Sequence, residues 1–323
     1  MIFLEYLSLF ISNFICKNIQ KVFDMNLPKL LFLISLLILC FPEVDNAKSK
    51  SSIIAKNETV QKAGGGFIFT EGPAVAPDGR VYFTDQPNDR IHIWDEKKGI
   101  SLFLEGTGRS NGMYFNAKGQ LVTCADEHNQ LAYFDENKKL VVIHEGYDGK
   151  HLNAPNDLWI APDGGIYFSD PYYHRDWWTE GHKEIQDVRG VYFVSPDGKA
   201  VRVINDFETP NGLVGTPDGK VLYVADIQAG KTWKYEIQRD GSLANKTLFA
   251  PKGSDGMTID NEGNVYLTSG KVWVYNPNGE LIEEIVVPES PSNVCFGGKN
   301  RKTLFITART GVYTLKMNVK GVD

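Results

Sequence analysis

Six residues with oxygen-bearing side chains recur at one position of a repeated sequence pattern. In five repeats this residue precedes a turn glycine by eight positions, as Glu71 precedes Gly79. The set comprises Glu71, Asn111, Asn156, Asn211, Asp255 and, at the matching place of the last repeat, Asn293. Hard cations prefer carboxylate and amide oxygens, whereas a dedicated zinc site normally includes histidine or cysteine. The pattern predicts a Ca²⁺ site if these positions meet in space, with Zn²⁺ or Mn²⁺ as alternative cations.

Turn formation is a competing explanation for the same residues. Asn-Gly and Asp-Gly pairs are ordinary turn signals, and they account for Asn111, Asn211 and Asp255 one at a time. They do not account for Asn156, which is followed by Asp157, or for the register that Glu71 shares with the others. The site interpretation is therefore favoured.

The elements that must position these residues are six predicted hairpins. They read "APDGRVYFTD" (76–85), "NAKGQLVTCAD" (116–126), "APDGGIYFSD" (161–170), "TPDGKVLYVAD" (216–226), "DNEGNVYLTSG" (260–270) and "GGKNRKTLFITA" (297–308). The first five turn glycines are 40, 45, 55 and 44 residues apart, close to the length of one propeller blade. The sequence thus predicts an all-β fold, a six-bladed β-propeller with four-stranded blades. The inner strand of each blade would bring one polar position to the central channel.

The last blade requires a strand from elsewhere in the chain. Only three strands follow before the C-terminus, so a segment near residues 53–61 is predicted to add the outer strand and cover the exposed edge. The propeller domain is expected to span residues 49–323, after an N-terminal extension over residues 1–48.

The N-terminal extension reads as a secretory signal. Lys29 follows Met25 and precedes an apolar run from Leu30 to Phe41, and cleavage is expected near Ala47. We therefore expect export to a periplasmic or extracellular location, with Met1 and Met25 as alternative starts. The apolar run is short for a stable membrane span, and Leu39 disfavours a lipid anchor at Cys40.

Charge and cysteine content exclude some classes of function. The formal net charge is −6 and no Lys/Arg stripe is present, so no nucleic acid partner is expected. Cys124 and Cys295, which follow the predicted signal, lack Cys-x-x-Cys spacing and lie in apolar runs. Both are expected to be buried packing residues.

Residues 67–315 resemble the gluconolactonase and senescence-marker (regucalcin) family of six-bladed propellers. The resemblance is carried by "EGP", "PND", "PNGL" and "SDGM", which occur in that order and at blade spacing. It implies one divalent-metal site in the channel, usually for calcium. Carried over residue by residue, the implied ligands are Glu71, Asn156, Asn211 and Asp255, with Asn156 leaning toward substrate in regucalcin-like members.

A cation open to the channel could polarise an ester carbonyl, which suggests hydrolysis of sugar lactones. Asp255 or Glu71 would serve as the catalytic carboxylate, with a water between the metal and Asp255 as the preferred nucleophile. No Gly-x-Ser-x-Gly motif supports a serine nucleophile. The alternatives are a promiscuous arylesterase or phosphotriesterase resembling paraoxonase and diisopropylfluorophosphatase, and a non-enzymatic ligand-binding propeller.

A long insertion between the third and fourth hairpins carries the sequence "DPYYHRDWWTEGHKEIQDVRG" (170–190). Tyr172 and Trp177 are candidate contacts for a sugar ring, although such aromatics could equally pack on a neighbouring blade. The remaining candidate substrate-binding residues are Asn111, Asn156, Arg109 and His151. Aspartates at strand ends are expected to bind adjacent loops instead; these are Asp85, Asp126, Asp170 and Asp226.

Overall fold

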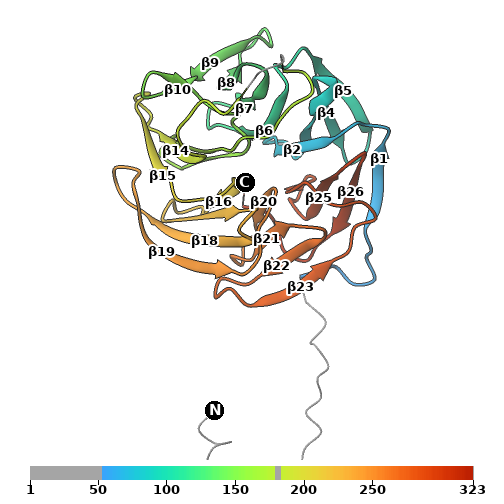
Figure 1. Ribbon diagram of the computed structural model, residues 1–323. Coiled ribbons are helices and arrows are strands. Elements are labelled where there is room, and N and C mark those ends of the chain that lie inside the picture. The colour runs from blue at the N-terminus through green and yellow to red at the C-terminus, as the bar shows by residue number, and fades with distance from the viewer. Residues whose placement is uncertain (1–52, 179–182, 323) are drawn as a thin grey trace, which may run out of the picture. The chain divides into compact units, whose positions relative to one another are not determined.

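The computed structural model describes residues 53–178 and 183–322. The predicted secretory signal and Cys40 lie outside these residues. Six four-stranded antiparallel sheets surround a central axis (Figure 1). No α-helix occurs in the described part of the chain, which contains only two short 3₁₀ turns, η1 (Gln86–Asn88) and η2 (Asp126–His128). The predicted six-bladed β-propeller is confirmed.

The first three blades run outward from the axis in chain order. Blade one comprises β2 (Thr70–Val75), β3 (Val81–Asp85), β4 (Arg90–Asp95) and β5 (Gly99–Glu105). Blade two comprises β6 (Ser110–Phe115), β7 (Leu121–Ala125), β8 (Gln130–Phe134) and β9 (Leu140–His144). Blade three comprises β12 (Leu158–Ile160), β13 (Ile166–Asp170), β14 (Gly190–Val194) and β15 (Ala200–Ile204). A small hairpin of β10 (Gly146–Tyr147) and β11 (Lys150–His151) precedes blade three.

The other three blades complete the circle. Blade four comprises β16 (Pro210–Gly215), β17 (Val221–Asp226), β18 (Lys231–Ile237) and β19 (Leu243–Ala250). Blade five comprises β20 (Met257–Ile259), β21 (Val265–Thr268), β22 (Val272–Tyr275) and β23 (Leu281–Ile285). Blade six comprises β24 (Asn293–Gly297), β25 (Thr303–Ala308), β26 (Gly311–Lys316) and β1 (Gln61–Gly65). The inner strands contact one another from β2 round to β24, and β24 contacts β2 again.

Closure by an N-terminal strand is confirmed, although the strand begins where the predicted segment ended. β1 pairs antiparallel with β26, and Ile54 forms a bridge to Met317 farther along the same edge. The strand sequence "QKAGG" has no apolar alternation, and its pairing shifts register between Lys62 and Gly64. Because of these features, the apolar pattern of the sequence did not give the correct position of the strand.

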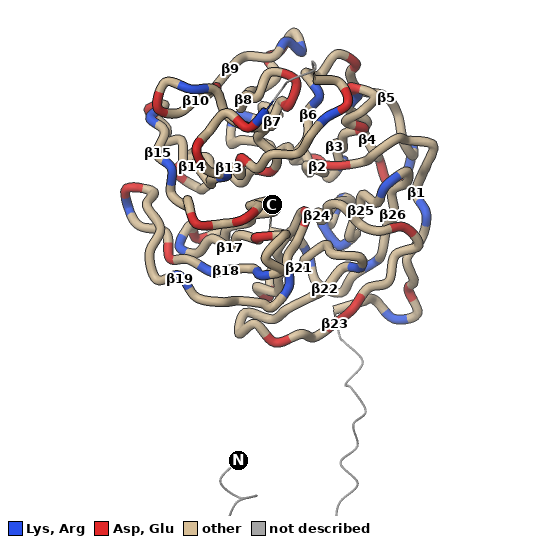
Figure 2. Tube along the Cα trace, viewed as in Figure 1, with Lys and Arg blue, Asp and Glu red and all other residues tan. Residues whose placement is uncertain are grey.

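The blades pack through alternating apolar side chains and stacked aromatic rings. The second strands of all six blades are almost entirely buried, and Tyr167, Tyr192 and Tyr266 are among the largest side chains with no exposure. Cys124 and Cys295 are buried, as predicted. Lys and Arg are distributed over all the blades rather than gathered in one stripe (Figure 2). No helix in the described part of the chain has the length and apolar character needed to cross a membrane.

Candidate functional site

The inner strands bring one polar residue per blade to the axis. Equivalent positions are defined by the hydrogen bonds between the first and second strands of each blade: Asn156 N donates to Ser169 O, and Asp255 N donates to Thr268 O, both at 2.9 Å. Ser292 N donates to Thr307 O in the same way in blade six. We call this set the axial ring, and its members are Glu71, Asn111, Asn156, Asn211, Asp255 and Ser292.

Blade six therefore departs from the predicted register by one residue. Asn293 occupies the position that follows the axial ring, where the other blades have Gly72, Gly112, Asp157, Gly212 and Gly256. The first hairpin of blade six is longer, and Arg301 rather than glycine adopts the left-handed turn conformation, with φ of 55°. Counting back from a turn glycine therefore gave no register here.

Direct contacts link several members of the axial ring. Asn211 Nδ2 donates to Asp255 Oδ1 at 2.9 Å. On the opposite side of the axis, Asn293 Nδ2 donates to Glu71 Oε2 at 3.3 Å, so Asn293 reaches the ring although it is not in register with it. Glu71 and Asn211 are buried, with 4% and 2% of their surface exposed, whereas Asp255 is half-buried.

Two buried oxygens of the axial ring have no hydrogen-bond partner among residues 53–178 and 183–322. These are Asn111 Oδ1 and Asn211 Oδ1. A buried acceptor left without a donor destabilises a protein by about 1–3 kcal/mol, so such atoms usually mark a missing partner. The amide nitrogen of Asn211 points to Asp255 and Tyr173, which leaves its oxygen available to a cation.

The carboxyl groups at the axis resist ionisation when no cation is present. Burial, followed by the charges of Asp255 and Asp157, raises the pKa of Glu71 well above its usual range. Burial also raises the pKa of Asp255 to about 6, although its hydrogen bond with Asn211 and the charges of Arg175 and Arg309 oppose the shift. Concentrated negative charge in a buried place is the environment that a divalent cation stabilises.

Asp157 is a third axial carboxylate, and the sequence prediction assigned it no role. Its side chain is 93% buried and accepts a hydrogen bond from Leu158 N at 2.9 Å. Burial, with a further contribution from the charge of Asp255, raises the pKa of Asp157 to about 7. The signal was present in the sequence, because four other blades have glycine at this position. Comparing the residue after each ring position would have identified it.

The space on one side of the axial ring is small. A cavity of about 30 Å³, roughly the volume of one water molecule, lies among the later residues of the inner strands. Its lining includes Met113, Leu158, Leu213 and Val294. A substrate the size of a sugar ring could therefore reach the axial ring only from the opposite side, where the insertion lies.

The first half of the insertion packs across this side of the channel. We call residues 171–189 the rim insertion. Arg175 Nε donates to Asp126 Oδ2 at 2.7 Å, and Gln86 Nε2 donates to the same oxygen at 2.9 Å. The ring of Trp177 lies 4.8 Å from the guanidinium of Arg109 and 5.5 Å from that of Arg175. The insertion is thereby fixed to blades one and two.

The rim insertion also reaches the axial ring directly. Asn211 Nδ2 donates to the hydroxyl of Tyr173 at 2.9 Å. Burial, followed by the charge of Asp255, raises the pKa of Tyr173. The guanidinium of Arg175 lies 5.5 Å from the centre of the Tyr173 ring. The sequence prediction selected Tyr172 and Trp177 from this segment, whereas the residue that contacts the axial ring is Tyr173.

The other predicted substrate contacts differ in their positions. Arg109 and Trp177 stack on each other near the channel mouth, and Tyr172 lies with its ring 5.8 Å from that of Trp178. His151 is exposed on β11, and its backbone carbonyl accepts a hydrogen bond from Gln186 Nε2 at 2.8 Å. Within the described residues, nothing connects the His151 side chain to the axial ring.

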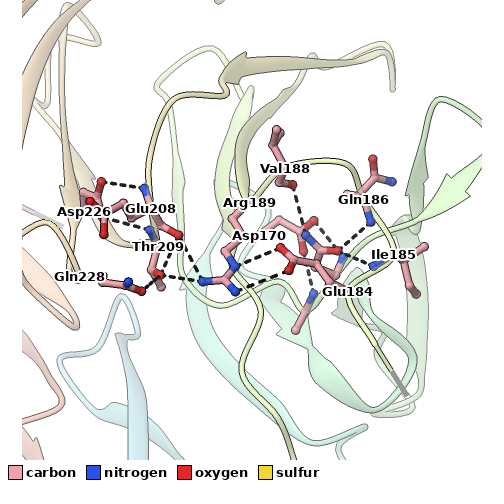
Figure 3. Close-up of polar contacts among 12 residues, drawn as sticks. Asp170, Glu184, Ile185, Gln186, Val188, Arg189, Glu208, Thr209, Asp226 and Gln228 are labelled. Atoms are coloured by element: carbon pink, nitrogen blue, oxygen red, sulfur yellow. Dashed lines mark hydrogen bonds and ion pairs between the residues drawn. The ribbon is translucent and has the colours of Figure 1, made fainter. Parts of the chain in front are cut away.

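The second half of the rim insertion is bound to blades three and four (Figure 3). Asn153 Oδ1 accepts hydrogen bonds from Ile185 N and Gln186 N at 2.9 and 2.8 Å. Arg189 pairs with Glu184 at 3.0 Å and donates to Thr209 Oγ1 at 3.1 Å. The same view contains Asp170 and Asp226, two of the strand-end aspartates. Both ends of the insertion are thus tied to the propeller.

The donor set at the axis fits a hard divalent cation. Within the described residues, no three His, Cys, Asp or Glu side chains form a metal-binding group. A cation here would instead be held by Glu71 and Asp255 together with amide oxygens, of which Asn211 Oδ1 and Asn111 Oδ1 are unsatisfied. Mixed carboxylate and amide ligation with water is typical of calcium sites. The residues present therefore fit the cation that the sequence predicted.

Comparison with known proteins places these features in a family. Residues 69–310 match the SMP-30/gluconolactonase/LRE-like region. A gluconolactonase from Zymomonas mobilis is 30% identical over 284 residues, which cover 78% of this chain and 80% of that protein. A gluconolactonase structure from Xanthomonas campestris has a TM-score of 0.75 at 27% identity, covering 82% of this chain and 91% of its own.

A more distant structure shares the fold. The calcium-binding protein regucalcin from Agrobacterium tumefaciens has a TM-score of 0.67 at 19% identity, covering 83% of this chain and 95% of its own. The match over residues 69–310 includes all six axial-ring positions and the rim insertion. The chain belongs to the SMP-30/gluconolactonase/LRE-like family.

Proposed function

We propose that this protein hydrolyses sugar lactones and depends on a divalent cation, with Ca²⁺ as the preferred ion. The observation that carries the proposal is the axial ring itself, which combines the buried carboxylate of Glu71 and the half-buried carboxylate of Asp255 with two buried amide oxygens that lack partners among the described residues. The gluconolactonase from Zymomonas mobilis and the one from Xanthomonas campestris supply the substrate class by similarity.

The chain's own residues have separable roles in this reaction. Glu71, Asn211 and Asp255 would hold the cation, which when bound supplies Lewis acidity toward the lactone carbonyl. Asp255 would also accept a proton from an attacking water beside the cation. Burial of the axial ring keeps bulk water away from the carboxylates of Glu71 and Asp255.

The surroundings of the channel mouth favour a polar substrate. The guanidinium groups of Arg109 and Arg175 lie 4.8 and 5.5 Å from the centre of the Trp177 ring. Guanidinium groups donate several hydrogen bonds, which suit the oxygens of a hydroxylated substrate. A hydroxylated lactone therefore fits this mouth better than the large apolar esters of the alternative arylesterase interpretation.

A lactone panel followed with a pH indicator tests the proposal. Glucono-δ-lactone hydrolysis should be lost after thorough chelation with EDTA and should return most fully with Ca²⁺, with Zn²⁺ and Mn²⁺ as the comparison ions. Activity that survives chelation would contradict the cation requirement. Turnover of aryl esters without turnover of any lactone would instead support the arylesterase alternative.

We also propose that the mature protein is exported. This rests on the sequence from Met25 to about Ala47, which lies outside the described residues. N-terminal peptide mapping of the protein from its natural source should find a first residue after position 40. A mature chain that retains Met25 would overturn the proposal.

A further inference from the structure

Tyr173 joins the rim insertion to the axial ring. Its hydroxyl accepts a hydrogen bond from Asn211 Nδ2 at 2.9 Å, and the same amide group donates to Asp255 at 2.9 Å. The phenol oxygen is thus one hydrogen bond away from a proposed cation ligand. The sequence prediction did not select this residue, and the role of the axial ring described above does not use it.

The hydroxyl of Tyr173 retains a proton that it can donate. A phenol is ordinarily neutral at neutral pH and can accept one hydrogen bond while it donates another. Its bond with Asn211 uses the acceptor side, and no acceptor for its own proton is found among the described residues. Ionised Glu71 and Asp255 have no proton to donate, and the amide nitrogen of Asn211 already donates to Tyr173 and Asp255. Tyr173 is therefore a neutral donor available to a substrate oxygen there.

The position of this donor is fixed by a chain of contacts that leads away from the axis. The Arg175 guanidinium lies 5.5 Å from the centre of the Tyr173 ring, and Arg175 Nε is bonded to the fully buried carboxylate of Asp126 at 2.7 Å. Gln86 binds the same carboxylate oxygen. A donor held in place before the substrate arrives needs no reorganisation when negative charge develops, which is the condition for effective oxyanion stabilisation.

We propose that the Tyr173 hydroxyl donates a hydrogen bond to the carbonyl oxygen of a lactone bound at the axial ring. This inference rests on the proposed lactonase function. The carbonyl is the substrate group that must approach Asn211 and Asp255, because these residues would hold the activating cation. The bond strengthens as the carbonyl oxygen gains negative charge.

Replacement of the hydroxyl alone tests this role. In the full-length, calcium-loaded protein, Tyr173→Phe should lower kcat by about 100-fold, the usual effect of removing one oxyanion donor. The loss should be similar for glucono-δ-lactone and for δ-valerolactone, which has no hydroxyl groups. Calcium affinity, measured by calorimetry, should change by less than about threefold, since the phenol hydroxyl is not counted among the proposed ligands.

A binding measurement separates the carbonyl contact from turnover. δ-Valerolactam presents a similar carbonyl but resists hydrolysis, and calorimetry should show about tenfold weaker binding to calcium-loaded Tyr173→Phe than to the wild type, the scale of one hydrogen bond. The matched control is Tyr133→Phe, which removes a phenol hydroxyl from a half-buried tyrosine on β8 in blade two. That variant should match the wild type in kcat, calcium affinity and lactam binding.

Each other outcome overturns a distinct statement. Unchanged kcat and unchanged lactam binding in Tyr173→Phe would remove the proposed contact while leaving the lactonase function intact. A loss confined to glucono-δ-lactone would assign the hydroxyl to a sugar hydroxyl instead of the carbonyl. A loss of calcium affinity in parallel with kcat would make Tyr173 a support of the axial ring only. A wild-type protein that hydrolyses neither lactone with any cation would overturn the proposed function and this inference with it.

Discussion

Asp170 and Asp126 end the second strands of adjacent blades, yet they bind different partners. Asp170 accepts hydrogen bonds from Asn153 N and Ala154 N at 2.9 and 2.8 Å. Asp126 accepts none from the equivalent loop and instead binds the side chains of Gln86 and Arg175. The same position of the repeat therefore fixes a loop in one blade and holds the rim insertion in the next.

The common role is visible in two further blades. Asp85 binds Ile68 N and Phe69 N, and Asp226 binds Glu208 N and Thr209 N. In each case the bound amides lie three and two residues before the axial-ring residue, so the aspartate sets the backbone that delivers it. In blade two, Asp89 from blade one binds Thr107 N and Arg109 N and replaces this contact. Asp126 is therefore not needed by this loop, and its carboxylate binds Gln86 and Arg175 instead.

A wider contrast follows between the strand-end aspartates and the axial ring. The carboxylates of Asp85, Asp170 and Asp226 are satisfied by backbone amides, which is typical of structural groups. The axial ring instead has two buried amide oxygens, Asn111 Oδ1 and Asn211 Oδ1, that lack a hydrogen-bond partner among the described residues. Polar groups left without protein partners are expected where a ligand completes the site.

The largest effect that tests this contrast is expected from Asp255→Asn. The substitution preserves size and one oxygen but removes a negative charge, so calcium should bind more weakly while the fold persists. If Asp255 also receives the proton of the attacking water, kcat at saturating calcium should stay about 100-fold or more below the wild type. Calorimetric calcium titration and lactone turnover at saturating metal measure the two effects separately. Full recovery of kcat would leave Asp255 as a ligand only.

The opposite behaviour is expected from a strand-end aspartate. Asp226→Ala leaves the amides of Glu208 and Thr209 without their acceptor, which should lower the free energy of unfolding by about 3 kcal/mol. Calcium affinity of the folded protein should change by less than about threefold, since the charge lies outside the axial ring. Urea unfolding at saturating calcium gives the stability. Asp218→Ala, in an exposed turn, is the control and should cost less than about 1 kcal/mol.

The sequence predicted much of the fold because its signals are local and repeated. Turn glycines such as Gly79 and Gly164 adopt positive φ at the same point of each hairpin, and they established both the blade number and the ring register. Blade six lacked this marker, since Arg301 occupies the turn, and the predicted register failed there. The closing strand β1 was located imprecisely because "QKAGG" carries no apolar pattern.

The site was harder to predict where it depends on contacts between distant segments. Asp157 lies on an inner strand beside a predicted residue, but its approach to Asp255 depends on the arrangement of the blades. Tyr173 is hydrogen-bonded to Asn211, 38 residues away in the sequence, and Arg175 is bound to Asp126, 49 residues away. No pattern within one repeat encodes such contacts.

The pH dependence of stability should show the raised pKa of the axial carboxyl of Asp157 when wild type and Asp157→Asn are compared. Because burial raises the pKa of Asp157 to about 7, the folded metal-free protein retains a proton that the unfolded chain releases near pH 4. The free energy of unfolding should therefore fall as pH rises from about 4 to 7. In EDTA, Asp157→Asn should match the wild type near pH 4 and exceed it by about 4 kcal/mol near pH 8.

Thermal unfolding across this pH range, with EDTA or with calcium, provides the measurement. Added calcium should stabilise the wild type most above pH 7, because cation binding requires the ionised carboxylates. A difference between wild type and Asp157→Asn that does not vary with pH would show that Asp157 has the same ionisation in the folded and unfolded chains.

The smallest expected effect comes from Asp126→Asn, and it addresses the opening comparison most directly. The amide oxygen can still accept the hydrogen bond from Gln86, but the charge that binds Arg175 is removed. The attachment of the rim insertion to blade two should therefore weaken while blade two stays folded. Stability should change by less than about 1 kcal/mol, because losing the ion pair is offset by removing a buried carboxylate whose pKa is raised to about 6. We expect KM for glucono-δ-lactone to rise about threefold with kcat within twofold, as for weakened substrate positioning.

Asp85→Asn is the matched variant for this last test. Asp85 binds Ile68 N and Phe69 N, so its amide replacement should lower the free energy of unfolding while KM stays near the wild-type value. Stability measured by urea unfolding and KM measured at saturating calcium therefore form two independent axes. If Asp126→Asn shifts stability as Asp85→Asn does and leaves KM unchanged, Asp126 is an ordinary strand-end aspartate. If the two variants separate along these axes, a single repeated position has acquired two physical roles because Asp89 took over the loop of blade two.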